Sequence, residues 1–252
     1  MKYLNTLNKP PIRKWFGGTN LIILKTPKLR LRLSKNHRKP KSAFLFIQYL
    51  DSIDLGGSFL DVGTGDSGIL AYYANARGVK KVTACDKSVS SLAKAQEVSK
   101  RAENIRWCVS DVFSGVKDGF DIIVSNAAQM PMPQEEHIAD YGGVDGRDMV
   151  IKLLQGAHSH LNSGGKMLIL LFDFLGVDKR LNSDKSLLEI AENFDLKGEV
   201  LAEVKKDIRE GGETEKNLEY INKIYPLYKF QKNKDGEIFH KIYIVQFALK
   251  TK

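Results

Sequence analysis

Residues 59–68 join a short apolar run to three glycines, and this junction constrains the fold more than any other stretch of the chain. The apolar run ends at Asp61, and the glycines follow in the pattern Gly63-x-Gly65-x-x-Gly68, ahead of a helix-like segment at 69–77. Glycine lets the backbone turn sharply and approach a ligand closely, because it has no Cβ. The first N–H groups of the following helix suit a nucleotide or a carboxylate. The segment therefore predicts a strand–loop–helix unit that binds an adenosine-containing cofactor.

Strand-like and helix-like segments alternate along most of the remaining chain. Short apolar strands are predicted at 58–61, 81–85, 105–109, 120–125 and 166–173, and helices at 42–53, 68–77, 88–101, 145–161 and about 184–193. Strands separated by helices of this length form right-handed crossovers, which give a parallel sheet covered on both faces. Two long strands at 197–209 and 238–250, with a helix at 215–224 between them, predict an antiparallel pair. We expect an α/β fold with a doubly wound, mostly parallel seven-stranded sheet and an antiparallel closing strand.

The positive charge of the chain is concentrated at its beginning. The 252 residues carry a formal net charge of +9, yet residues 1–42 hold twelve Lys or Arg and no Asp or Glu. We expect 1–42 to be a basic N-terminal arm, with a possible strand pair at 21–24 and 29–33, and 43–252 to form the cofactor-binding domain. Such an arm suits a contact with RNA, a ribosome or an acidic protein surface. A purely solvated extension is the alternative, and the sequence leaves both open.

Several classes of protein do not fit the composition. No run of about 18 uninterrupted apolar residues is present, so no transmembrane helix is expected, and the first 20 residues lack the apolar core of a signal peptide. Cys85 and Cys108 fall in separate strand-like runs and are expected to be buried, reduced thiols. The five histidines show no ligand spacing, so no metal site is expected. A cytoplasmic protein without membrane or metal partners is the resulting expectation.

Three carboxylates stand at the ends of successive predicted strands. Asp61 ends the first strand of the domain, Asp86 ends the second, and Asp111 follows the third. The carboxyl ends of parallel strands line one crevice, where Asp86 could accept both hydroxyls of a ribose and Asp111 an adenine amino group. A dinucleotide fingerprint is the rival interpretation. It usually has an apolar residue in place of Asp61 and gives Asp111 no role, so the constellation favours a mononucleoside cofactor.

These motifs resemble those of S-adenosylmethionine-dependent methyltransferases with a seven-stranded sheet. The likeness rests on Asp61-x-Gly-x-Gly-x-x-Gly68, Ala84-Cys-Asp86-Lys-Ser and Ser110-Asp-Val-Phe. Phe120-Asp-Ile-Ile-Val-Ser-Asn126, Tyr141-Gly-Gly-Val-Asp-Gly146 and Leu161-Asn-Ser-Gly-Gly-Lys-Met-Leu168 narrow it to the release-factor glutamine methyltransferases and related small-domain methyltransferases. The resemblance covers roughly residues 58–172 and implies S-adenosyl-L-methionine as cofactor. The cofactor-binding residues that it implies are Asp61, Gly63, Thr64, Gly65, Asp86, Lys87, Asp111, Val112 and Asn126.

The segment after the fourth strand departs from that family. There the strand ends in Asn-Pro-Pro-Tyr, where the target amide or base amino group binds, whereas this chain has Asn126-Ala-Ala-Gln-Met-Pro131. The resemblance implies that the side-chain oxygen of Asn126 and the next carbonyl accept the two N–H groups of the target. Loss of the prolines removes a φ restraint, and loss of the tyrosine removes a stacking surface. Gln129 can hydrogen-bond in both directions instead, so Asn126 and Gln129 are the candidate catalytic residues.

We therefore expect a methyltransferase that acts on an amide or amino nitrogen of a protein or RNA substrate. Three alternatives stay open at this stage. One is a small-molecule methyltransferase on the same fold, and another is an NAD(P)-dependent oxidoreductase. The third is a basic RNA- or ribosome-binding module with a vestigial cofactor crevice.

Overall fold

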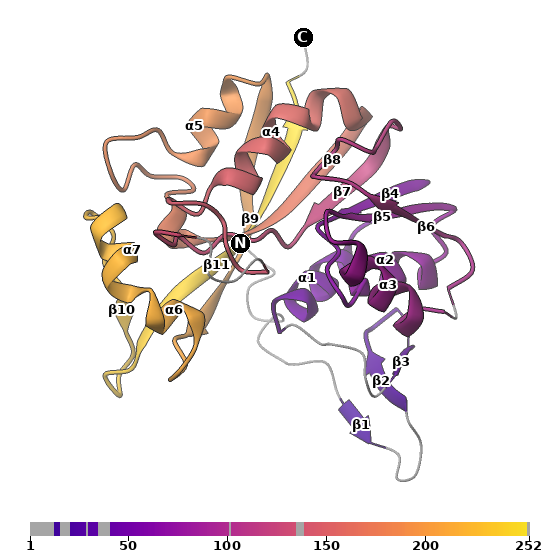
Figure 1. Ribbon diagram of the computed structural model, residues 1–252, viewed down its shortest axis with the longest axis horizontal. Helices are drawn as coiled ribbons and strands as arrows, with labels where there is room; N and C mark the ends of the chain where they lie inside the picture. Colours follow the sequence, from indigo (N-terminus) through magenta and orange to yellow (C-terminus); the bar gives the residue numbers. More distant parts are fainter. Residues whose placement is uncertain are drawn as a thin grey trace. The chain divides into compact units, whose positions relative to one another are not determined.

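The computed structural model describes residues 13–15, 21–28, 30–34, 41–100, 102–134 and 139–250 (Figure 1). These residues form two compact units. The N-terminal unit holds the described residues up to 126 together with 160–167, and the C-terminal unit holds those of 127–159 and 168–250. Strand β8 (Leu161–Phe172) runs through both. Each unit is therefore described by itself.

The N-terminal unit is built on parallel strands. Its order is β8-β7-β4-β5-β6, where β4 is Ser58–Val62, β5 is Lys81–Asp86, β6 is Ile105–Val109 and β7 is Phe120–Ser125. The pairs β4–β5, β4–β7 and β5–β6 are all parallel. Strand β4 is buried along its whole length, as expected for a strand covered on both faces. The predicted parallel arrangement is confirmed.

Three helices cover these strands. Helix α2 (Ile69–Ala76) packs on β4, β5 and β6, helix α3 (Val89–Val98) packs on β5 and β6, and helix α1 (Lys41–Ser52) packs on α2. Helix α3 begins after Ser88, whose Oγ accepts the Ser91 N–H at 3.2 Å and so satisfies one free donor of the first turn. The largest fully buried side chains of this unit are Phe46, Phe59, Tyr73 and Phe120.

The basic arm contains a small antiparallel sheet of its own. Strands β1 (Arg13–Trp15), β2 (Leu21–Lys25) and β3 (Arg30–Ser34) pair in that order. The predicted strand pair is thus confirmed, and β1 adds a third strand. The rest of the arm lies outside the described residues, and the domain boundary at residue 42 stays a prediction.

The C-terminal unit supplies the antiparallel part of the fold. Long strands β9 (Leu196–Asp207) and β11 (Ile238–Leu249) pair antiparallel, with a register shift between Ile244 and Val245. Strand β8 and the two-residue β10 (Gln231–Lys232) are the other neighbours of β11. The helices are α4 (Asp148–His160), α5 (Leu187–Glu192), α6 (Glu213–Lys216) and α7 (Leu218–Ile224). The predicted fold class is confirmed, and β10 is an eighth strand in the sheet that was expected to have seven.

Two predicted boundaries were wrong. The strand expected at 166–173 begins earlier, since β8 starts at Leu161, and Asn162 Nδ2 ties this early part of the strand to Asp121 Oδ1 of β7 at 2.8 Å. The helix expected at 215–224 is broken at Asn217, where α6 ends and α7 begins. Asn217 Nδ2 donates to the Glu213 carbonyl at 2.9 Å, a local side-chain bond of the kind that competes with a continuous helix.

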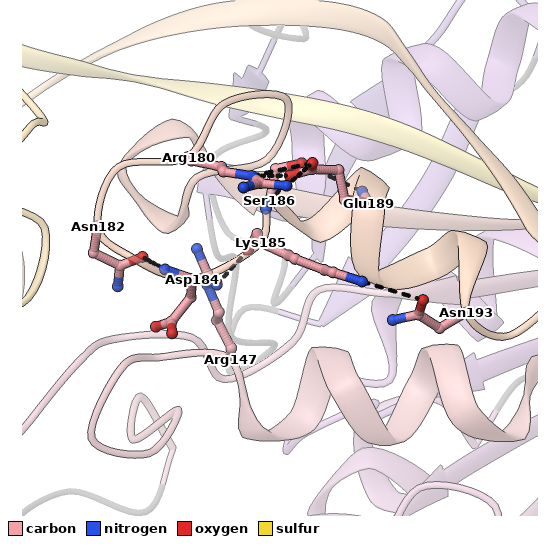
Figure 2. Close-up of polar contacts among 8 residues, drawn as sticks. All are labelled: Arg147, Arg180, Asn182, Asp184, Lys185, Ser186, Glu189 and Asn193. Atoms are coloured by element: carbon pink, nitrogen blue, oxygen red, sulfur yellow. Dashed lines mark hydrogen bonds and ion pairs between the residues drawn. The ribbon is translucent and has the colours of Figure 1, made fainter.

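A single buried arginine organises the segment that leads into α5. Arg147 donates from Nε and Nη2 to the Leu175 carbonyl and from Nη1 to the Lys185 carbonyl at 3.0 Å. Figure 2 shows this guanidinium bonded to Lys185, which precedes the capping box in which Ser186 and Glu189 exchange hydrogen bonds. Arg147 is thus a buried anchor of this loop, whereas the ion pair between Arg180 and Glu189 is largely exposed and such pairs contribute little.

Candidate functional site

The glycine loop after β4 is tied to the end of β5 within the N-terminal unit. The N–H groups of Gly63 and Thr64 donate to the Cys85 carbonyl at 2.9 and 3.0 Å. The Gly65 N–H donates to Asp86 Oδ2 at 2.9 Å, and Gly65 has a φ of +64°. A Cβ placed on Gly65 would meet nothing within 4 Å. The loop therefore leaves open space directly beside the carboxylate that ends β5.

Asp86 is held in a fixed orientation by two backbone donors. Gly65 N–H binds its Oδ2, and Ser88 N–H binds its Oδ1 at 2.8 Å. The side chain is half-buried, and each carboxylate oxygen can accept more than one hydrogen bond. Both oxygens therefore retain acceptor capacity for a pair of neighbouring hydroxyls. Lys87, the next residue, is exposed.

Asp61 is buried rather than open to the crevice. It is only 2% exposed, and its Oδ2 accepts the Thr64 hydroxyl at 2.6 Å and the Ala71 N–H of helix α2 at 3.2 Å. Burial raises the pKa of Asp61 to about 6; the bonds from Thr64 and Ala71 oppose this rise, and the nearby charge of Asp86 adds to it. Asp61 thus joins the loop to the first turn of α2 and carries an unfavourable charge at neutral pH.

The third predicted carboxylate precedes a strained residue. Val112 has a φ of +53° and is buried, and a β-branched side chain is a genuine outlier in this region. Its carbonyl accepts the Ser110 hydroxyl at 2.9 Å and the Cys85 thiol at 3.4 Å, which hold the turn in place. Asp111 is exposed, and its N–H donates to Ser114 Oγ at 3.0 Å. Backbone strain of this kind clusters at ligand sites.

Asn126 ends β7 and is oriented by a residue that the sequence did not reveal. Its Nδ2 donates to Ser42 Oγ, in helix α1, at 3.2 Å. The preceding Ser125 donates its hydroxyl to the Val62 carbonyl at 2.9 Å and so joins the end of β7 to the end of β4. With the amide nitrogen directed at Ser42, the amide oxygen is the atom that Asn126 can offer to an acceptor substrate. No pattern near Ser42 in the sequence signals this contact, because the two residues are 84 positions apart.

Gln129 lies in the C-terminal unit and is fully engaged with backbone. Its Oε1 accepts the Phe172 N–H at 2.7 Å, and its Nε2 donates to the carbonyls of Leu170 and Ala127 at 2.7 and 3.2 Å. The side chain is buried, 3% exposed. Gln129 does bond in both directions, as the sequence suggested, but its partners are the end of β8 and its own loop. We therefore assign it to positioning this loop rather than to contact with a substrate.

The C-terminal unit also holds a buried polar cluster at the end of β8. Asp173 Oδ1 accepts the Tyr228 hydroxyl at 2.9 Å and lies 3.8 Å from His240 Nδ1. Burial raises the pKa of Asp173 to about 6 and lowers that of His240 to about 3, so His240 is neutral. Lys206 Nζ lies 4.4 Å from the centre of the Phe172 ring, and burial lowers its pKa to about 8.

Other kinds of site are not evident in the described ranges. No group of three or more His, Cys, Asp or Glu side chains there could hold a metal ion. No helix of those ranges has the length and apolar character needed to cross a membrane. An open cavity of about 630 Å³ in the C-terminal unit has a lining of mixed charge: Asp145, Asn182, Ser183, Asp184, Lys223, Ile224, Pro226 and Leu227. Cys85 is buried and Cys108 half-buried, and neither is in a disulfide.

The sequence of the chain is similar to those of known proteins, and this similarity agrees with the glycine loop and the strand-end carboxylates described above. The family model described as methyltransferase small domain matches residues 36–195. The chain belongs to this family. A release factor glutamine methyltransferase of Koribacter versatilis is 36% identical over 124 residues, which cover 44% of each chain. A ribosomal RNA small subunit methyltransferase C of Citrobacter koseri is 32% identical over 136 residues, 53% of this chain and 36% of that protein.

A solved structure shows the same fold. The YcgJ protein of Bacillus subtilis superposes with a TM-score of 0.55 at 15% identity, covering 84% of this chain and 99% of that one. This likeness establishes the fold alone. The chain spans less than half the length of the two curated relatives named above, so their activities remain proposals for it.

Proposed function

We propose that this protein is an S-adenosyl-L-methionine-dependent methyltransferase that acts on an amide or amino nitrogen of a macromolecular substrate. The observation that supports this most is the pairing of Gly65 with Asp86. Open space at the glycine adjoins a half-buried carboxylate that two backbone N–H groups hold in place. Residues 43–252 would form the catalytic domain and residues 1–42 its basic extension. A cytoplasmic location stays a prediction.

The residues of the N-terminal unit fit this cofactor. Asp86 would accept both ribose hydroxyls, and the backbone at Gly63 and Gly65 would line the ligand. Asp111 and the strained Val112 would contact the adenine, and Asp61 would contribute negative charge toward the cationic amino acid portion. When bound, the cofactor supplies a methyl group already activated by a sulfonium. The protein's part is then mainly positioning and electrostatic stabilisation.

Asn126 is the residue on which nitrogen chemistry would depend. An amide or ring amino nitrogen is a poor nucleophile because its lone pair is delocalised. The Asn126 oxygen would accept one N–H of the target and help hold the lone pair out of conjugation, in line with the methyl group. Ser42, which takes the other end of the Asn126 amide, would keep that oxygen aimed at the substrate.

The alternatives have different support. The relatives reported above carry methyltransferase names, one for a protein and one for an RNA substrate, and give the oxidoreductase alternative no support. The labelling experiment described below distinguishes a small-molecule methyl acceptor from a macromolecular one.

Cofactor binding is tested by isothermal titration with S-adenosylhomocysteine and NADH. We expect binding of the first only, and Asp86→Ala should weaken it by about 1–3 kcal/mol, the cost of leaving hydroxyls unpartnered. Asp178→Ala removes an exposed carboxylate of the C-terminal unit and serves as the control. Equal affinity of the two variants would contradict the placement of the site.

Methyl transfer is tested with label from S-adenosylmethionine supplied to separated RNA, protein and small-molecule fractions of a cell extract. Label should enter a macromolecular fraction. Asn126→Ala should abolish most of this transfer even at a saturating concentration of S-adenosylmethionine. Full turnover of Asn126→Ala on the labelled substrate would refute the nitrogen assignment.

A further inference from the structure

The end of strand β9 carries a lysine whose charge is not neutralised by a neighbouring carboxylate. Lys206 is half-buried, and its Nζ lies 4.4 Å from the centre of the Phe172 ring, at the end of β8. Within the part of the chain that the structure describes, this ammonium has no hydrogen bond and no ion pair. An ammonium partly removed from water is unfavourable unless a counter-charge or hydrogen bonds compensate it. The position therefore calls for a partner from outside the unit.

The two lysines that flank this position, along the strand and across from it, are both paired. Lys205 Nζ lies 3.3 Å from Asp207 Oδ1, and Lys241 Nζ lies 3.0 Å from Glu203 Oε2. Side chains alternate along a strand, so Lys205 and Lys206 lie on opposite faces. The lack of a counter-charge is thus specific to the face that Lys206 occupies.

The residue opposite Lys206 does not supply the missing negative charge. His240 is the register partner of Lys206 on β11 and is fully buried. Its Nδ1 donates to the Lys241 carbonyl at 3.0 Å, since a carbonyl oxygen only accepts, and its Nε2 has no hydrogen-bond partner in the described ranges. Burial lowers the pKa of His240 to about 3. The imidazole is therefore neutral and presents a lone pair at Nε2, so it neither neutralises Lys206 nor binds an anion itself.

A second cation acts on Lys206 from three residues further along the chain. Burial lowers the pKa of Lys206 to about 8, the positive charge of Arg209 lowers this pKa further, and the carboxylate of Asp140 opposes both effects. Arg209 is exposed, and among the described residues its guanidinium also has no ion pair. Two cations therefore repel each other here, and one carboxylate is close enough to act on Lys206. An anion bound between the cations would remove this repulsion.

We propose that Lys206 and Arg209 bind a carboxylate group of a ligand. A single negative charge matches the excess of two cations over the one carboxylate of Asp140. A doubly charged phosphate would exceed it and would be repelled by Asp140. A guanidinium binds a carboxylate through two parallel N–H bonds, and an ammonium adds a compact point charge. The Phe172 ring beside the ammonium excludes water, which strengthens an ion pair at this position.

The site is connected to the loop that follows Asn126 in the chain. The Phe172 N–H donates to Gln129 Oε1 at 2.7 Å, and the Met130 N–H donates to the Asp140 carbonyl at 2.9 Å. Both neighbours of Lys206 are thus bonded to this loop. The carboxylate belongs either to a free carboxylic acid or to the methyl acceptor itself. The site goes beyond the proposed function, because carboxylate binding does not require methyl transfer.

Carboxylate binding is tested by protection of Lys206 from trace acetylation with acetic anhydride at about pH 8, near the pKa of this residue. Tandem mass spectrometry of the full-chain protein measures the rate at each lysine, with sodium propionate as the probe and sodium chloride at equal ionic strength as the reference. Ion pairing favours the charged amine, so propionate should slow acetylation of Lys206 at least about threefold. Lys205, exposed on the opposite face, should be unaffected, and Arg209→Gln should reduce the protection of Lys206. Equal rates for Lys206 in the two salts would overturn the proposal, as would equal protection of Lys205 or stronger protection by inorganic phosphate.

The source of the carboxylate is tested by steady-state kinetics on the cell-extract fraction that accepts the methyl label. Lys206→Met removes the charge but keeps an apolar contact with Phe172. If the acceptor carries the carboxylate, KM for the acceptor should rise at least about tenfold with little change in kcat. Lys206→Arg should retain the wild-type KM, and Lys205→Met is the matched control. Protection by propionate together with an unchanged KM in Lys206→Met would assign the site to a free carboxylic acid. Absence of methyl transfer would contradict the proposed function alone, since the acetylation experiment needs no turnover.

Discussion

Replacing Asp61 by Asn should change how the stability of the protein depends on pH. Burial raises the pKa of Asp61 to about 6, from an ordinary value of 3.8. The unfolded chain therefore loses this proton near pH 4, while the folded protein keeps it until about pH 6. Between those values the folded state binds more protons than the unfolded state, so the free energy of unfolding falls as the pH rises. Above about pH 6 the folded protein bears the full free-energy cost of the buried, charged Asp61 carboxylate.

The size of the effect follows from the shift. A difference of about two pKa units corresponds to about 3 kcal/mol, at 1.36 kcal/mol for each unit. Asn can place its oxygen where Oδ2 stands and still accept from Thr64 and Ala71, because both bonds go to that one atom. We therefore expect Asp61→Asn to match the wild type near pH 4 and to exceed it by up to about 3 kcal/mol at pH 8.

Urea denaturation of the ligand-free protein at a series of pH values measures this. Asp173 also has a raised pKa, of about 6, and contributes to the wild-type profile in the same window. The difference between wild type and Asp61→Asn isolates Asp61, and Asp173→Asn serves as a parallel case in the C-terminal unit. A stability difference that does not vary with pH, or one that favours the wild type at pH 8, would refute the reasoning.

Three further predictions concern other single substitutions in the two units. Gly65→Ala and Gly78→Ala each place a side chain at positive φ in open space, so both should lower the free energy of unfolding by about 1–2 kcal/mol, but only the first should weaken S-adenosylhomocysteine binding in a titration. Ser42→Ala should lower kcat with little change in KM, because it frees the Asn126 amide without removing it. The loss of kcat should be smaller than the loss caused by Asn126→Ala. Gln129→Leu should cost about 2–4 kcal/mol in urea denaturation, since two buried backbone groups of β8 lose their partner.

The sequence predicts the parts of this fold that depend on local patterns. The apolar strands β4 to β7 and the glycine loop are encoded within a few residues, and each lies close to where it was expected. The three strand-end carboxylates were found for the same reason: a strand end is a local property.

The sequence does not predict contacts between distant segments. Ser42 meets Asn126 across 84 positions, and Gln129 bonds β8 more than 40 positions away. Asn162, in the stretch between the predicted helix at 145–161 and the predicted strand at 166–173, bonds Asp121 across 41 positions. Polar side chains of these types favour turns and caps in isolation, and only tertiary contacts decide otherwise.

The unfavourable features of the N-terminal unit gather in the residues proposed to bind the cofactor. Asp61 keeps a buried carboxylate that titrates near pH 6, and Val112 keeps a backbone conformation that β-branched residues avoid. Neither is required by the parallel sheet itself, since Asn or Gly would satisfy the same local hydrogen bonds or dihedrals at lower cost. Strained backbone and perturbed pKa values recur at functional sites, where a ligand can compensate them. A cationic group near Asp61 would lower the pKa of this carboxyl. Binding of a cationic ligand should therefore release a proton near pH 6, and this release links the stability of the N-terminal unit to whether the ligand is bound.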